Sequence, residues 1–140
     1  MDELNERDLF RVRFRFLDLI KSFFALEPDA EMMSRWRGTF SALAQEQVSP
    51  RFDNAVKEIS RALNDKTLKE RQGEYVNLLF NPFDGSMVET TASYYLNGRS
   101  YDQTLVDIRS LMNEAGVQKD KAVTVPEDSL VVMLDTFASL

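Results

Sequence analysis

The sequence predicts an all-α fold, a bundle of about six helices joined by short connections. Apolar residues recur at intervals of three and four over most of the chain, which is the spacing of one helix face. Capping residues and prolines stand where one such pattern ends and the next begins. With 140 residues and 44% apolar residues, we expect residues 1–140 to form a single domain with one core.

The first predicted helix covers residues 4–25. Its polar residues form one narrow stripe at spacings of four, four, three and four: Arg7, Arg11, Arg15, Asp18 and Ser22. Leucine, isoleucine and phenylalanine occupy most of the remaining surface, so we expect this helix to be largely buried. Residues 11–16 also alternate like a strand, but the polar stripe persists over four turns and favours a helix.

Three further helices are predicted at 29–47, 50–63 and 67–80. Asp29 places negative charge at the start of the first, and Trp36 is expected in its core. Ser49 followed by Pro50 is a typical start for the second. Thr67 and Glu70 have the spacing of a capping box at the start of the third.

The remaining sequence predicts the longest irregular segment at 81–91 and two more helices, at 100–115 and 125–140. Ser100 and Gln103 are expected to cap the first of these helices, which would include Tyr101. Thr124 and Glu127 have capping-box spacing before the second. That last helix has an apolar face, formed by Leu130, Met133, Leu134, Phe137 and Leu140, that needs a partner surface from this domain or another chain.

The composition excludes many enzyme classes. The chain has no cysteine and no histidine, so disulfides, thiolate or imidazole metal sites and a Ser-His-Asp triad are impossible. Most enzyme functions are therefore disfavoured. No targeting segment and no apolar run long enough for a bilayer span is visible, which indicates a cytoplasmic protein without stable membrane insertion.

The net charge of −6 is unevenly distributed. Residues 81–140 contain four basic and nine acidic residues and so carry −5 of it. An acidic surface disfavours nucleic acid and favours a basic partner. The acidic residues equally fit a simpler role in keeping a small domain soluble.

Two pairs of neighbouring residues are candidates for a binding site. Tyr94 and Tyr95 cannot both face one core, so at least one should lie near the surface, where tyrosine suits binding contacts. Glu127 and Asp128 stand at a predicted helix start, where they stabilise the helix dipole or form a negative patch for a cation of a partner.

Four segments resemble those of the TorD/DmsD/NarJ-type maturation chaperones of bacterial and archaeal molybdoenzymes. They are RFRFLDLIKSFFALEPDAEMM, YVNLLFNP at 75–82, TASYYLNGR at 91–99 and VPEDSLVVMLDTFASL at 125–140. Two positions depart from the family pattern: Ser129 stands where a histidine is usual, and Ala92 where many members have glutamate. The family usually continues with further helices, so the resemblance implies a TorD-like domain without the family's last helices, either a C-terminally truncated chain or a shortened member. It also implies a homodimer formed by exchange of the C-terminal helix.

The resemblance implies a binding protein rather than an enzyme, with no cofactor of its own. It would be a cytoplasmic chaperone that binds the twin-arginine signal peptide and the apo-catalytic subunit of a molybdoenzyme. Such a chaperone assists cofactor insertion and delays export. The client site is expected between the 81–95 segment and the start of the last helix, using Tyr94, Tyr95, Glu127, Asp128 and Ser129. Two other classes stay open. One is an unrelated all-α adaptor or regulatory module that binds an amphipathic helix, and the other is a small enzyme with a carboxylate-bound metal.

Overall fold

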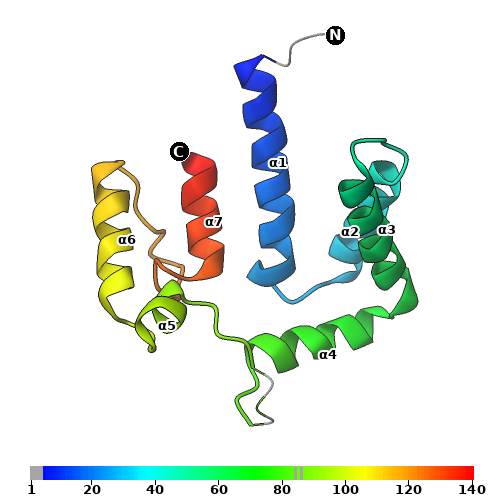
Figure 1. Cartoon of the computed structure of the whole chain (residues 1–140). Helices are drawn as coiled ribbons and strands as arrows, with labels where there is room; N and C mark the ends of the chain where they lie inside the picture. The colour runs from blue at the N-terminus through cyan, green and yellow to red at the C-terminus, as the bar shows by residue number, and fades with distance from the viewer. Residues whose placement is uncertain (1–4, 84, 86) are drawn as a thin grey trace. The chain divides into compact units, whose positions relative to one another are not determined.

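The computed structural model describes residues 5–83, 85 and 87–140, and these contain seven helices and no strand (Figure 1). The all-α prediction is therefore confirmed. The helices are α1 (Glu6–Ala25), α2 (Ala30–Leu43), α3 (Pro50–Asp65), α4 (Leu68–Leu79), α5 (Ala92–Asn97), α6 (Gln103–Glu114) and α7 (Leu130–Ser139). No helix in the described part of the chain is both long and apolar enough to cross a bilayer.

The described residues fall into two compact units. One combines the residues up to Leu26 with Val88–Leu140, and the other comprises those within Glu27–Met87. The first unit therefore contains α1, α5, α6 and α7, and the second contains α2, α3 and α4. A single domain over residues 1–140 requires that the two units unfold together, and this stays a prediction.

The helices of the second unit begin at the predicted positions or one residue after them. Asp29 accepts a hydrogen bond from the Met32 amide at 2.7 Å, and Ser49 accepts one from the Phe52 amide at 3.2 Å. Thr67 and Glu70 form the complete capping box, in which each side chain accepts from the other residue's amide. These starts depend on residues only three positions apart, so local spacing is enough to predict them.

The core of the second unit lies between α2 and α3. It consists of buried side chains from both helices: Met33, Trp36, Phe40, Val56 and Leu63. Two arginines from neighbouring helices satisfy the carbonyl groups at the C-terminal end of α3. Arg37 donates to the Leu63 and Lys66 oxygens at 3.0 and 3.2 Å, and Arg71 donates to the Ala62 oxygen. Their positive charge also complements the negative end of the helix dipole.

In the first unit, α1 packs against α7 and α5 packs against α6. Leu105 and Met112 of α6 and Val132 of α7 are its buried apolar side chains. Lys21 and Asp135 join α1 to α7 through an ion pair of 2.6 Å. The face of α7 that needed a partner surface is thus partly covered by α1 of the same chain.

The prediction that the first helix is largely buried is wrong, because α1 contains no buried residue. Phe10 and Phe14 remain 52% and 47% exposed. Within its unit, α1 makes its extensive contacts with α7, and one neighbouring helix covers only one side of a cylinder. The apolar composition of the helix was correct, but the number of its neighbours could not be read from it.

The C-terminal half differs from the prediction in its boundaries. The six residues of α5 were not predicted, since so short a helix shows less than two turns of periodicity. The cap of α6 is Asp102 rather than Ser100 or Gln103, and Tyr101 lies outside the helix with a left-handed φ of 59°.

The last helix begins at Leu130 rather than at residue 125, with Ser129 as its N-cap. Thr124 and Glu127 therefore form no capping box on it. The preceding connection, 115–129, is longer than the one between α4 and α5, which corrects the expectation that 81–91 is the longest irregular segment. Antiparallel pairing of the chain just before α7 decides where that helix starts.

Candidate functional site

The segment before α5 pairs with the segment before α7. Thr91 and Ser129 form an antiparallel bridge. The Ala92 amide donates to the Asp128 carbonyl at 2.9 Å, and the Leu130 amide donates to the Thr90 carbonyl at 2.8 Å. Two stretches that are almost forty residues apart in the sequence, and that carry all five predicted site residues, therefore meet in one place.

Asp128 occupies the centre of this junction, with a side chain that is 0% exposed. Its Oδ2 accepts a hydrogen bond from the Ser93 amide at 2.8 Å, in the first turn of α5. Thr91, the N-cap of α5, makes no side-chain capping bond. Asp128 thus supplies from a distant segment the acceptor that a helix start normally takes from its own N-cap.

Ser93 connects α5 to α6 through a hydrogen bond of its side chain. Its Oγ accepts a hydrogen bond from the Leu105 amide at 3.1 Å, and Ser93 is itself 0% exposed. Asn97 of α5 also accepts a bond from the Thr104 amide, at 2.9 Å. The position of α6 therefore depends on α5, whose start in turn depends on Asp128.

Two oxygens at the junction keep unused hydrogen-bonding capacity. Asp128 Oδ1 and Ser129 Oγ are buried and have no hydrogen-bond partner among the described residues. A buried polar atom without a partner costs free energy, of about 1–3 kcal/mol for a neutral group. A donor group from a bound molecule would offset that cost.

Glu127 lies beside the junction and pairs with Arg109 of α6, with 3.0 Å between Oε2 and Nε. The Glu127 side chain is 18% exposed and that of Arg109 is 55% exposed. Burial raises the pKa of Glu127, but hydrogen bonds from its own backbone and from Arg109 outweigh burial, so the pKa lies below its usual range. Glu127 is therefore a charged carboxylate near the surface.

Both tyrosines of α5 reach the surface. Tyr94 is 44% exposed and Tyr95 is 64% exposed, and their rings meet edge to face with centroids 5.2 Å apart. The Tyr95 hydroxyl donates to the Glu89 carbonyl at 2.8 Å. The expectation that at least one of the pair lies near the surface is confirmed.

The structure thus gathers the five predicted residues but gives them different access to solvent. Tyr94 and Tyr95 are exposed, Glu127 is partly buried, and Asp128 and Ser129 are buried. Sequence reasoning missed Ser93 and Arg109, whose partners lie on other segments and leave no signal in local spacing. In the described part of the chain, no three acidic side chains are arranged to hold a metal ion.

Comparisons with known proteins concern the family and the fold. Residues 45–140 match the model of a protein family described as nitrate reductase delta subunit. The fold is similar to that of a proposed redox enzyme maturation protein from Archaeoglobus fulgidus, with a TM-score of 0.61 and 21% sequence identity. The alignment covers 91% of this chain and 70% of that one. A search of curated proteins gives no match.

Proposed function

Because the chain belongs to the nitrate reductase delta subunit family of NarJ/TorD-type redox-enzyme maturation chaperones, we propose that it binds the apo-catalytic subunit of a molybdoenzyme. Members of this family are chaperones rather than enzymes. The match over residues 45–140 carries the proposal, since it includes the site described above. In this role the protein holds the client's twin-arginine signal in the cytoplasm, and export waits until the cofactor has been inserted.

The signal-peptide site in this proposal lies on α5 and the segment before α7. Tyr94 and Tyr95 offer exposed rings for the apolar part of the signal, and Glu127 offers a carboxylate to an arginine. Glu127 already holds one guanidinium, that of Arg109, so a client arginine replaces a partner of the same chemistry.

Asp128 and Ser129 belong to the proposed site as its buried part. Each keeps one oxygen without a partner, and a donor from the client would satisfy it. Because Asp128 is completely covered, the client reaches it only by displacing the groups around it. We therefore expect Glu127 and the tyrosines to contribute most of the direct contact.

Calorimetry with a synthetic twin-arginine peptide tests this site. Glu127→Gln should weaken binding by about 1–2 kcal/mol, since it removes one charge-assisted hydrogen bond near solvent. Glu114→Gln on α6 is the matched control, with the same change at an exposed position. Affinity should also fall with added salt and with an Arg-Arg→Lys-Lys peptide.

The experiments can contradict the proposed site without contradicting the proposed function. Equal affinities for wild type, Glu127→Gln and both peptides would remove the acidic residues from the site. If the wild type still recovers a molybdopterin-binding subunit from native extract, the chaperone function stands without this site. If it recovers none and binds no signal peptide, the proposed function is wrong.

Dimerisation by exchange of the C-terminal helix also belongs to this proposal. In such a dimer the α7 helix of one copy packs on the α1 helix of the other, through the contacts that now lie within one chain. The Lys21–Asp135 pair would then form between copies. Light scattering over a concentration series should show a dimer, and a monomer at every concentration would contradict the exchange.

A further inference from the structure

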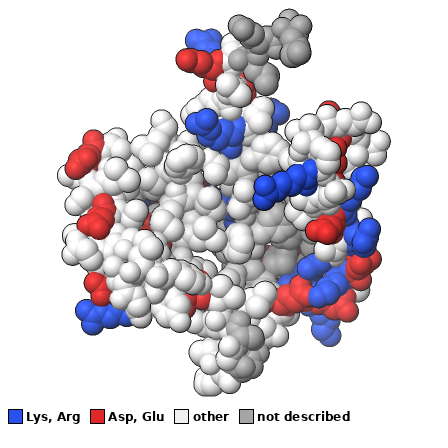
Figure 2. All heavy atoms as spheres, viewed as in Figure 1, with Lys and Arg blue, Asp and Glu red and all other residues white. Residues whose placement is uncertain are grey.

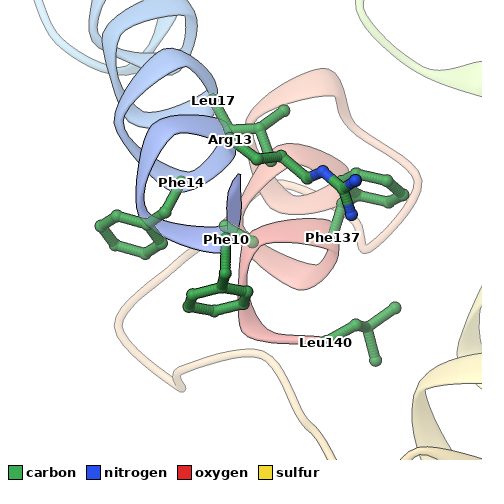
Figure 3. A pocket seen from close by; sticks show the side chains of 7 residues that line it. Phe10, Arg13, Phe14, Leu17, Phe137 and Leu140 are labelled. Atoms are coloured by element: carbon green, nitrogen blue, oxygen red, sulfur yellow. The ribbon is translucent and has the colours of Figure 1, made fainter. Parts of the chain in front are cut away.

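An open groove runs between α1 and α7, away from the residues of the proposed signal-peptide site. Figure 3 shows it lined by Phe10, Phe14 and Leu17 of α1, by Phe137 of α7 and by Leu140 just after α7, together with Arg13. Its volume is about 250 Å³. That is room for a few large side chains rather than for a whole helix.

The walls of this groove are apolar and incompletely covered. Phe10, Phe14 and Phe137 are 52%, 47% and 56% exposed, and Leu140 is 62% exposed. Single exposed apolar residues are ordinary on a protein surface, but several that line one concave site favour a binding surface. Burying such side chains against a partner releases free energy in proportion to the apolar area covered.

The charge around the groove is opposite to that of the protein. The net charge is −6, yet Arg7, Arg11, Arg13 and Arg15 all lie in the first half of α1. A second depression shares Phe10 with the groove and is lined by Arg7 and Arg11, with Glu6 as its acidic member. Figure 2 shows basic side chains over α1 and mainly acidic ones over α6.

These arginines are available to a ligand. Among the described residues, no ion pair or hydrogen bond is formed by the side chains of Arg7, Arg11 or Arg13. Lys21, farther along α1, differs because Asp135 neutralises it. Unpaired guanidinium groups beside exposed phenylalanines match a partner that combines carboxylates with large apolar side chains.

We propose that the α1–α7 groove binds an acidic amphipathic helix of a partner protein. Its leucine or phenylalanine side chains enter the groove, and its carboxylates pair with Arg13 and, beyond Phe10, with Arg7 and Arg11. This ligand has the opposite charge to a twin-arginine signal, so the groove is a second site with its own specificity. An exchanged dimer would contain the same groove, because exchange preserves the α1–α7 contact.

Two other occupants fit the observations less well. A lipid surface suits a convex apolar helix face, whereas this site is concave and lies on a protein that anionic lipid repels through its net charge. A second copy of the chain, in the exchanged dimer proposed above, takes part in the α1–α7 contact itself and leaves the groove open. An acidic helix with a regular apolar face complements both the apolar walls of the groove and its arginines.

Fluorescence anisotropy with a labelled synthetic helix tests the proposal. The probe carries leucines at helical spacing with glutamates beside them, and the comparison peptide has lysine in place of every glutamate. The glutamate probe should bind, and Arg13→Glu should weaken it about tenfold by replacing attraction with repulsion. Arg15→Glu is the matched control, because it makes the same change on the same helix outside the groove, and should weaken binding less than about threefold.

A second variant addresses the apolar part of the groove. Phe137→Ser removes a large exposed ring and should also weaken the glutamate probe, while circular dichroism checks that both variants retain their helices. Equal binding of the two peptides, or equal losses with Arg13→Glu and Arg15→Glu, would overturn the proposal. Binding of the protein to phosphatidylglycerol vesicles but not to the probe would overturn the proposal as well. The same holds if the probe fails to bind and Arg13→Glu dissociates a dimer.

Discussion

Replacing Asp128 with alanine is expected to lower the free energy of unfolding by about 2–3 kcal/mol, because it leaves the Ser93 amide without an acceptor in a site closed to water. The effect should extend to α6, whose first turn is held by Ser93. Urea titration followed by circular dichroism measures it.

Asp128→Asn is the control for this experiment. Asparagine keeps one oxygen that can accept from the Ser93 amide, so its loss of stability should be smaller than that of the alanine variant. In the proposed client site, the same change should weaken signal-peptide binding by about 1–3 kcal/mol if the charge of Asp128 meets the client directly. A stability of Asp128→Ala equal to wild type would show that this buried hydrogen bond does not hold α5.

Trp36→Ala is expected to lower the free energy of unfolding further, by about 3–5 kcal/mol, because it leaves a cavity in the core between α2 and α3. Trp36 is 4% exposed, and Met33 and Phe40 of the same helix are buried with it. Trp36→Phe should lower the free energy of unfolding clearly less, since phenylalanine retains an aromatic ring. Circular dichroism is again the measurement, because the alanine variant has lost the protein's single tryptophan.

Together the two alanine variants test whether residues 1–140 form a single domain. Asp128 lies in the first compact unit and Trp36 in the second. If the chain unfolds as one domain, each variant shifts the same single transition, and Trp36 fluorescence reports the effect of Asp128→Ala. Two transitions, each moved by only one of the variants, would contradict the single-domain prediction.

The sequence by itself determined the fold class and most helix starts. Ser49 and the Thr67–Glu70 pair cap their helices as expected, because an N-cap and the amide it satisfies lie two or three residues apart. Asp29 was expected only to place negative charge at a helix start, and it is the N-cap of α2. The polar stripe over four turns likewise predicted a helix at residues 11–16 despite their strand-like alternation. These features depend on neighbours in the chain, and local patterns contain that information.

Only the tertiary structure decided the environment of the site residues. Asp128 and Glu127 are adjacent in the sequence, yet one is buried under the start of α5 and the other pairs with Arg109 near the surface. The exposure of α1 also depends on how many helices pack around it. Burial and pairing arise from segments far apart in the chain, so no local spacing could distinguish a buried helix cap from a surface carboxylate.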